Sequence, residues 1–127
     1  MRVLIDTHVL IWYLNGDKVL PSRTADILSN NDNKLFVSTI SLWEIAIKIS
    51  LGKLELSLSL KQIEEYLKDK DVELLDIKFE PLIKLLDLPH HHRDPFDRLL
   101  IAQAISEKLT IISADRHFAA YPVEVIW

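Results

Sequence analysis

The sequence predicts an α/β fold, a three-layer α/β/α sandwich around a central, mostly parallel sheet of about five strands. Short apolar runs, such as residues 3–5 and 109–113, alternate along the chain with segments of helical length and pattern. This alternation is typical of strand–helix–strand units, which cover both faces of a parallel sheet. With 127 residues, of which 49% are hydrophobic, the chain is expected to form one domain over residues 1–127.

Five short runs rich in Val, Ile, Leu and Phe are expected to form the strands. They are residues 3–5, 35–38, 72–77, 109–113 and 123–126. Polar or turn-forming residues bound these runs, and strands that are buried on both faces are largely apolar in this way.

The first three helices are expected over residues 7–14, 22–29 and 41–51. Gly16 is expected to follow the end of the first helix, and Gly52 the end of the third. Glycine suits these places because it readily adopts the left-handed conformation that follows many helices.

Four further helical segments are expected at residues 59–70, 79–86, 94–108 and, as a short turn, 115–120. Ser59 is a good N-cap for the first of them, and Pro89 closes off the second. Asp94 and Pro95 open the longest helix, because Asp suits the N-cap and Pro suits the first helical position.

Two of these helices are more apolar than one buried face requires. Residues 9–14 are apolar all round, and residues 42–49 are nearly so. A helix of this kind must be covered on every side. We therefore expect part of that cover to come from another chain, with burial inside the monomer as the alternative.

The composition excludes several classes of function. The chain has no Cys, which rules out disulfides, thiolate nucleophiles and cysteine-ligated zinc. Its two glycines, Gly16 and Gly52, are too far apart for a GxGxxG turn or a Walker A loop. The net charge of -4 gives no general attraction to nucleic acid, so such binding needs a local basic patch or a metal.

No membrane association is expected. Asp6 interrupts the N-terminal apolar run before a signal peptide could form. No apolar run approaches the ~20 residues of a transmembrane helix. A soluble, cytoplasmic protein is therefore expected.

Four carboxylates occupy comparable places in this pattern. Asp6 and Asp115 each follow a strand, and Glu44 and Asp97 lie near the starts of two helices. Parallel strands bring such positions to one edge of the sheet, where α/β proteins build their sites. Burying four acids together is costly unless a hard metal ion shares them. The set therefore predicts a metal-dependent site.

Each acid also has a purely structural interpretation. Ser41 and Glu44 fit a capping box, and Asp94 and Asp97 fit the same pattern. The other two acids could be ordinary N-caps. All four are expected at one edge of the sheet, and this coincidence favours the functional interpretation of the set.

The histidines do not indicate a zinc site. His90, His91 and His92 are consecutive and cannot all face one ion in ordinary backbone geometry, so a polar loop is expected. Their roles stay open. His8 and His117 each follow a candidate acid by two residues and could line the site or be exposed.

Four motifs carry a resemblance to a known family. They are residues 4–8 (LIDTH), 41–46 (SLWEIA), 94–102 (DPFDRLLIA) and 113–115 (SAD). The sequence resembles PIN-domain nucleases over essentially its whole length, and more narrowly the VapC toxins of bacterial toxin–antitoxin pairs. The resemblance implies a PIN-like α/β/α domain, Mg²⁺ or Mn²⁺ dependence, homodimers and ribonuclease activity held in check by a cognate antitoxin.

The resemblance also assigns residues. Asp6, Glu44, Asp97 and Asp115 match the acidic quartet of the family. Ser113 stands near the last acid, where relatives often have Thr, and keeps the hydroxyl. Asp94 belongs to the subfamily pattern but not to the general quartet, and we expect it to support the site indirectly.

Roles for the quartet follow from the chemistry of phosphodiester hydrolysis. Asp6 and Asp97 are expected to bind the metal directly, and Asp115 directly or through water. Glu44 is expected to position the attacking water. Oxygen ligands suit Mg²⁺ and Mn²⁺, which lower the pKa of bound water and neutralise developing charge.

Basic residues near the acids have two interpretations each. Lys48 lies one turn after Glu44 and could reach that carboxylate or a substrate phosphate. Arg93, Arg98 and Arg116 flank the acids and could bind the RNA backbone or be solvated at the surface. No helix-turn-helix or basic arm is evident, so no direct DNA binding by this chain is expected.

Two alternatives belong to other classes. A receiver-type signalling domain also places aspartates at strand ends around Mg²⁺. It needs a paired acid beside Asp6 and a lysine after the last strand, and the sequence has neither; Asp76 fits the phosphoacceptor only if the third strand is stretched. A catalytically inactive PIN-like binding module is the other alternative, against which the intact quartet argues.

Overall fold

The sheet contains five strands in the order β3-β2-β1-β4-β5. This computed structural model describes residues 1–16 and 18–127. The strands are β1 (Arg2–Ile5), β2 (Lys34–Ser38), β3 (Glu73–Leu75), β4 (Thr110–Ile112) and β5 (Val125–Ile126). Neighbouring strands pair in parallel throughout, so the predicted fold class is confirmed.

The helices connect these strands. They are α1 (Thr7–Leu14), α2 (Ser22–Ser29), α3 (Thr39–Ser50), α4 (Leu60–Asp69), α5 (Phe79–Asp87), α6 (Pro95–Glu107) and the 3₁₀ helix η1 (Arg116–Ala120). Gly16 and Gly52 follow α1 and α3 with φ of 63° and 68°, as predicted. No helix in the described part of the chain is long and apolar enough to cross a membrane.

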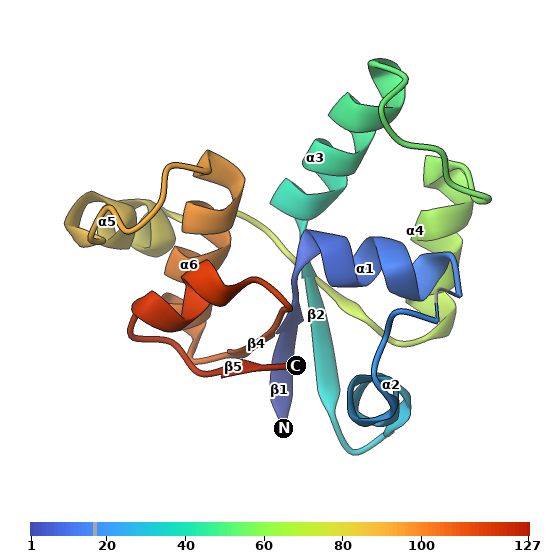
Figure 1. The fold of residues 1–127 in the computed structure, drawn as a ribbon, viewed down its shortest axis with the longest axis horizontal. Coiled ribbons are helices and arrows are strands. Elements are labelled where there is room, and N and C mark those ends of the chain that lie inside the picture. Colours follow the sequence, from blue (N-terminus) through green and yellow to red (C-terminus); the bar gives the residue numbers. More distant parts are fainter. Residues whose placement is uncertain (17) are drawn as a thin grey trace.

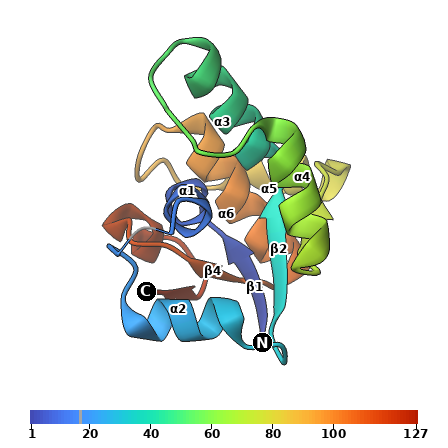
Figure 2. The same cartoon turned by 90° about the vertical axis from the view of Figure 1, so that its right-hand side faces the viewer.

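Alternate residues of β1 divide the core into two halves, one on each face of the sheet. Val3 and Ile5 pack with side chains of α1, α2 and α4, and Leu4 packs with those of α6 and η1. Figures 1 and 2 show the resulting layers, with α1, α2 and α4 on one face and α5 and α6 on the other. Helix α3 contacts both α1 and α6 and so joins the two layers above the sheet.

The carboxyl ends of the strands lie together at the edge from which α1 and α3 start (Figure 1). β1 and β4 are paired up to Ile5 and Ile112, and the backbone N–H of Asp6 donates to the carbonyl of Ile112 at 3.1 Å. The residues that follow β1, β2 and β4 are therefore neighbours. This register positions the candidate site.

Some element boundaries differ from the predicted ones. Helix α3 begins at Thr39 instead of residue 41, because Ser38 is its N-cap and its Oγ accepts from the Ile40 N–H at 3.1 Å. β3 is shorter than residues 72–77, because its partner β2 ends at Ser38 and offers no backbone beyond Leu75.

Most of helix α1 is covered within this chain, in line with the alternative of burial inside the monomer. Its apolar side chains are buried or half-buried within this chain, and Trp12 contacts Trp127 with ring centroids 5.7 Å apart. Exposed apolar side chains instead gather on α5, where Phe79 is 81% and Leu86 is 83% exposed. Helix α3 lies between these cases, with Ile45 buried and Trp43 58% exposed.

Candidate active site

Asp6 and Ser113 form the centre of the site at the ends of β1 and β4. Asp6 is buried, and its Oδ2 accepts a hydrogen bond from Ser113 Oγ at 2.9 Å. The same Oγ accepts from the backbone N–H of Asp115 at 3.0 Å. Ser113 therefore links the first and the last acid of the predicted quartet.

The start of α6 supplies Asp94 and Asp97, which have different environments. Asp94 is exposed and caps the helix, with Oδ1 accepting from the N–H groups of Phe96 at 2.9 Å and Asp97 at 3.1 Å. The side chain of Asp97 is buried and takes no part in the cap. Asp94 is thus the N-cap, as predicted, and the capping-box interpretation of Asp97 is wrong.

Glu44 is buried on α3. The capping-box interpretation is wrong here too, because α3 starts earlier and Ser41 accepts a hydrogen bond from Thr7 Oγ1 at 2.8 Å instead. Lys48 Nζ lies 3.2 Å from Glu44 Oε2, so it reaches the carboxylate, one of its two predicted positions. Glu44 Oε1 is buried without a hydrogen-bond partner among the described residues.

The structure brings the four acids within electrostatic reach of one another. Burial, followed by repulsion from Asp94, Asp6, Asp115 and Glu44, raises the pKa of Asp97 to about 8. Burial likewise raises the pKa of Asp6 to about 6, and Asp115 contributes to that rise. Elements far apart in the sequence thus converge to form one acidic cluster.

The cluster has the oxygen ligands that a hard divalent cation prefers, although its side chains are not arranged around one common position. Within the described residues, no three His, Cys, Asp or Glu side chains converge closely enough to hold an ion in this arrangement. Asp6 Oδ1 and Glu44 Oε1 are nevertheless buried without hydrogen-bond partners. Unsatisfied carboxylate oxygens and a buried acid with a raised pKa are both compatible with the binding of a cation.

Two histidines contact two of the acids. His92 Nε2 lies 3.5 Å from Asp97 Oδ2, and His117 Nδ1 lies 2.9 Å from Asp115 Oδ1. The two imidazoles are stacked, with centroids 5.5 Å apart and an interplanar angle of 7°. Partial burial raises the pKa of Asp115, but hydrogen bonds from the backbone and ring of His117 outweigh it, so the pKa is lowered overall. His90, by contrast, is exposed.

Arg98 does not lie at the surface, so neither interpretation left open by the sequence, contact with RNA or solvation at the surface, describes its position. Its guanidinium is buried and donates to the carbonyls of Pro89 at 2.7 Å and Leu88 at 3.1 Å. It also donates to the hydroxyl of Tyr121 at 3.3 Å. Arg98 therefore holds the loop before α6, while Arg93 and Arg116 are exposed.

An aromatic pair flanks two of the acids. Trp43, next to Glu44, meets Phe96, next to Asp97, edge to face with centroids 5.4 Å apart and an angle of 70°. The exposed indole therefore lies beside the acidic cluster.

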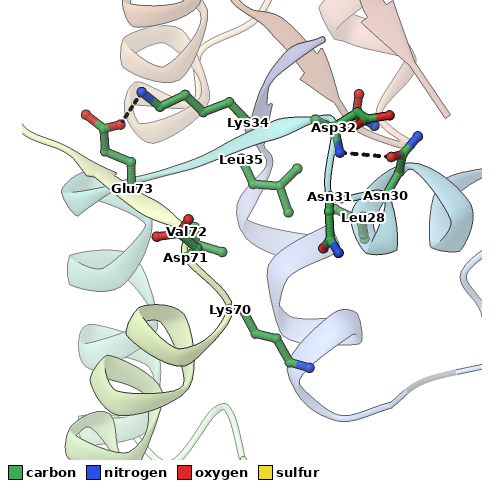
Figure 3. Close-up of a pocket in the computed structure, with 11 residues that line it drawn as sticks. Leu28, Asn30, Asn31, Asp32, Lys34, Leu35, Lys70, Asp71, Val72 and Glu73 are labelled. Atoms are coloured by element: carbon green, nitrogen blue, oxygen red, sulfur yellow. Dashed lines mark hydrogen bonds and ion pairs between the residues drawn. The ribbon is translucent and has the colours of Figure 1, made fainter.

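A polar pocket at the opposite end of the sheet is separate from this cluster. Figure 3 shows it between the start of β2, the start of β3 and the loop before β2. Lys34 Nζ there lies 3.0 Å from Glu73 Oε2, and Asn30 Oδ1 accepts from the Asp32 N–H at 2.9 Å. None of its lining residues belongs to the acidic cluster.

The sequence did not reveal His92 and Tyr121 as parts of the site. His92 lies in a run of three histidines, which gives no sign of which ring turns inward. Tyr121 lies in an unremarkable segment after η1, and the hydrogen bond between them spans 29 positions. Only the folded arrangement brings the two side chains together.

Comparison with known proteins identifies the family. The model of the PIN domain matches residues 3–124. A chain in the crystal structure of VapBC2 from Rickettsia felis bound to promoter DNA is similar in fold, with a TM-score of 0.74, 17% identity, and coverage of 100% of this chain and 99% of that chain.

Two further structures are also similar. DNA-bound VapBC from Salmonella typhimurium gives a TM-score of 0.71 at 18% identity, covering 99% of this chain and 97% of that chain. VapBC-5 from Mycobacterium tuberculosis gives 0.61 at 22% identity, covering 98% and 97%. The comparison with curated proteins gave no significant match.

The family match covers nearly all of the chain and the fold agrees with it, which decides against a receiver-type signalling domain. From the residue pattern, the sheet order and this match together, the chain belongs to the PIN domain family.

Proposed function

We propose that the protein is a metal-dependent endoribonuclease and the toxin of a VapBC-type toxin–antitoxin pair. The observation that carries this proposal is the convergence of Asp6, Glu44, Asp97 and Asp115 at one edge of the sheet. Burial, and then repulsion from Asp94 and the other three acids, raises the pKa of Asp97 to about 8. Acids gathered at this cost in burial and charge repulsion are typical of functional sites. Membership of the PIN domain family supports the same chemistry.

Asp6 and Asp97 would hold the ion directly, and Asp115 directly or through water. Mg²⁺ or Mn²⁺, when bound, would supply a more acidic water and neutralise charge on the phosphoryl oxygens. Ser113 fixes one oxygen of Asp6 and leaves Oδ1 without a described partner. That free oxygen is therefore available as a ligand.

Glu44 is suited to orienting the attacking water. Lys48 holds one of its oxygens at 3.2 Å, and the other has no hydrogen-bond partner among the described residues. A fixed carboxylate with one free oxygen can accept a hydrogen bond from water and align it for in-line attack. Lys48 thus positions Glu44 and does not itself bind the substrate in this arrangement.

The exposed ring of Trp43 beside the cluster suits an unpaired nucleobase, because bases stack on aromatic faces in single-stranded nucleic acid. Single-stranded RNA is therefore the proposed substrate. The similar solved structures are VapBC complexes, which supports a cognate antitoxin as the partner of this chain and a DNA-binding role for that partner.

The test is cleavage of single-stranded RNA by the purified protein with Mn²⁺, with EDTA, and with Mn²⁺ restored. We expect cleavage only when Mn²⁺ is present, and we expect Asp6→Asn to reduce it to the level seen in EDTA. Asp32→Asn is the matched control, because Asp32 is exposed at the opposite end of the sheet (Figure 3).

Full cleavage after exhaustive chelation, or equal cleavage by Asp6→Asn, would contradict the mechanism. A protein that binds RNA but never cuts it would be the inactive binding module instead.

A further inference from the structure

We propose that His92 is a positioning residue, which presents a fixed Nε2–H group to the carboxylate of Asp97, and that Tyr121 and Arg98 fix its tautomer. The inference deepens the proposed function, on which it rests where it treats Asp97 as a metal ligand. It concerns a histidine outside the acidic quartet.

The hydroxyl of Tyr121 decides the tautomer. Its oxygen receives the Arg98 Nη1–H at 3.3 Å and the backbone N–H of His92 at 3.2 Å. A phenol oxygen has two acceptor sites and one hydrogen, so these two donors leave only its hydrogen to be placed. The remaining partner is His92 Nδ1 at 2.8 Å, which must therefore accept.

An imidazole whose Nδ1 accepts a hydrogen bond carries its hydrogen on Nε2. Nε2 of His92 is buried and makes no hydrogen bond to any described group. It lies 3.5 Å from Asp97 Oδ2, which is long for a hydrogen bond. A buried donor is thus directed at a buried acid, and contacts of this kind often shorten when the site is filled.

The surroundings of His92 hold this donor in place. Its ring stacks on His117 at 5.5 Å and meets Tyr121 at 5.4 Å and Phe118 at 6.2 Å. Arg98, which donates to Tyr121, is itself anchored on two carbonyls of the loop before α6. The network therefore joins that loop, α6 and the segment after η1 around one ring.

The consequence concerns the orientation of Asp97. A donor directed at Oδ2 leaves Oδ1 for a cation and limits rotation of the carboxylate. Contacts of this outer kind typically change metal affinity or activity by about 10- to 100-fold when they are removed. His92 acts through Asp97 and does not touch the substrate.

The tautomer can be measured directly in the metal-free protein. Ring ¹⁵N shifts distinguish the two neutral forms of histidine, and we expect the wild-type His92 to carry its hydrogen on Nε2. Tyr121→Phe removes the hydroxyl but keeps the ring, and should give a mixture of both forms. A wild-type ring with hydrogen on Nδ1, or a Tyr121→Phe ring with an unchanged tautomer, would overturn the proposal.

The positioning role is tested by Mn²⁺ titration. His92→Leu should weaken Mn²⁺ binding by ~10-fold or more, whereas His92→Gln, whose amide N–H can replace Nε2–H, should stay within about threefold of the wild type. His90→Leu is the matched control, because His90 is exposed in the same loop. Unchanged Mn²⁺ affinity in a folded His92→Leu protein would contradict the role.

The two proposals fail in different ways. A wild-type protein that neither binds Mn²⁺ nor cuts RNA refutes the proposed function, whereas the ¹⁵N spectrum still decides the tautomer. If His92→Leu does not fold, the wild-type and Tyr121→Phe spectra still decide the tautomer, and a His92→Gln protein that binds Mn²⁺ more than about threefold more weakly would contradict the positioning role.

Discussion

Asp97 shows how one residue connects the chemistry of the site to the stability of the protein. Its carboxyl group is buried beside three other acids of the cluster, and its pKa rises from an ordinary 3.8 to about 8. The folded protein thus binds this proton more tightly than the unfolded chain does. The negative charge of Asp97, which a bound metal would need, therefore lowers the stability of the metal-free folded protein.

This difference predicts how metal-free stability depends on pH. Since the unfolded chain releases the proton near pH 4 and the folded chain near pH 8, stability contributed by Asp97 should fall as the pH rises between about those values. Asp97→Asn should flatten this decline and melt at a higher temperature than the wild type at pH 8. Thermal unfolding in EDTA from pH 5 to pH 8 measures both effects.

Asp94→Asn is the matched control for that variant. Asn keeps the N-cap of α6, so the protein should lose little stability and only part of its RNA cleavage, whereas Asp97→Asn should abolish cleavage. If Asp94→Asn were inactive while Asp97→Asn still cut RNA, the assignment of Asp97 as a metal ligand would be wrong.

For single residues, the sequence predicted the features that depend on the local sequence pattern. Asp6 and Asp115 follow strands and Asp97 lies in the first turn of α6, as their positions in the pattern predicted. The cap formed by Asp94 follows from its place before Pro95. The burial of Arg98 and the inward turn of one histidine depend on contacts between distant segments. No spacing in the sequence encodes those contacts.

Among the elements, α3 carries Glu44, and its start sets the direction in which that acid points. Three hydroxyl residues, Ser38, Thr39 and Ser41, lie where β2 ends and α3 begins. The sequence pattern favoured Ser41 as the cap because Glu44 follows it at the capping-box spacing. The structure uses Ser38, because β2 pairs with β3 up to that residue and α3 starts directly after it.

The cap gives a prediction for stability. Ser38→Ala removes the acceptor for the Ile40 N–H and should lower the free energy of unfolding by about 1 kcal/mol, measured by urea denaturation. Ser57→Ala, in the exposed segment between α3 and α4, should change it by less than about 0.5 kcal/mol. Equal values for the two variants would contradict the assignment of the cap.

For the whole molecule, the fold class was predictable because alternating strands and helices leave few other packings. The surface available for association with other chains was not predictable. The sequence pointed to residues 9–14 and 42–49 as interfaces. Most of α1 is covered by its own chain, Trp43 on α3 is exposed, and the two most exposed apolar side chains, Phe79 and Leu86, belong to α5. Periodicity identifies which residues are apolar, but not which neighbour covers them.

This surface predicts the site of self-association. We expect a homodimer at micromolar concentration in sedimentation velocity, and we expect Leu86→Glu to convert it to a monomer, because it places charge among Phe79 and Ile83. Leu51→Glu is the control, since Leu51 is 61% exposed just after α3 and away from α5. A monomeric wild type, or a dimer broken only by Leu51→Glu, would rule α5 out as the interface.

The central position of β1, between β2 and β4, also determines how late in synthesis the acidic cluster can form. The hydrogen bond between Asp6 and Ser113 joins residues 107 positions apart. Local helices can form as the chain emerges from the ribosome at about 5–20 residues per second, whereas pairing of β1 with β4 must await the later segment. A nascent or prematurely terminated chain therefore carries Asp6 without the partner that holds it, and the proposed active site can form only in a chain synthesised at least as far as Ser113.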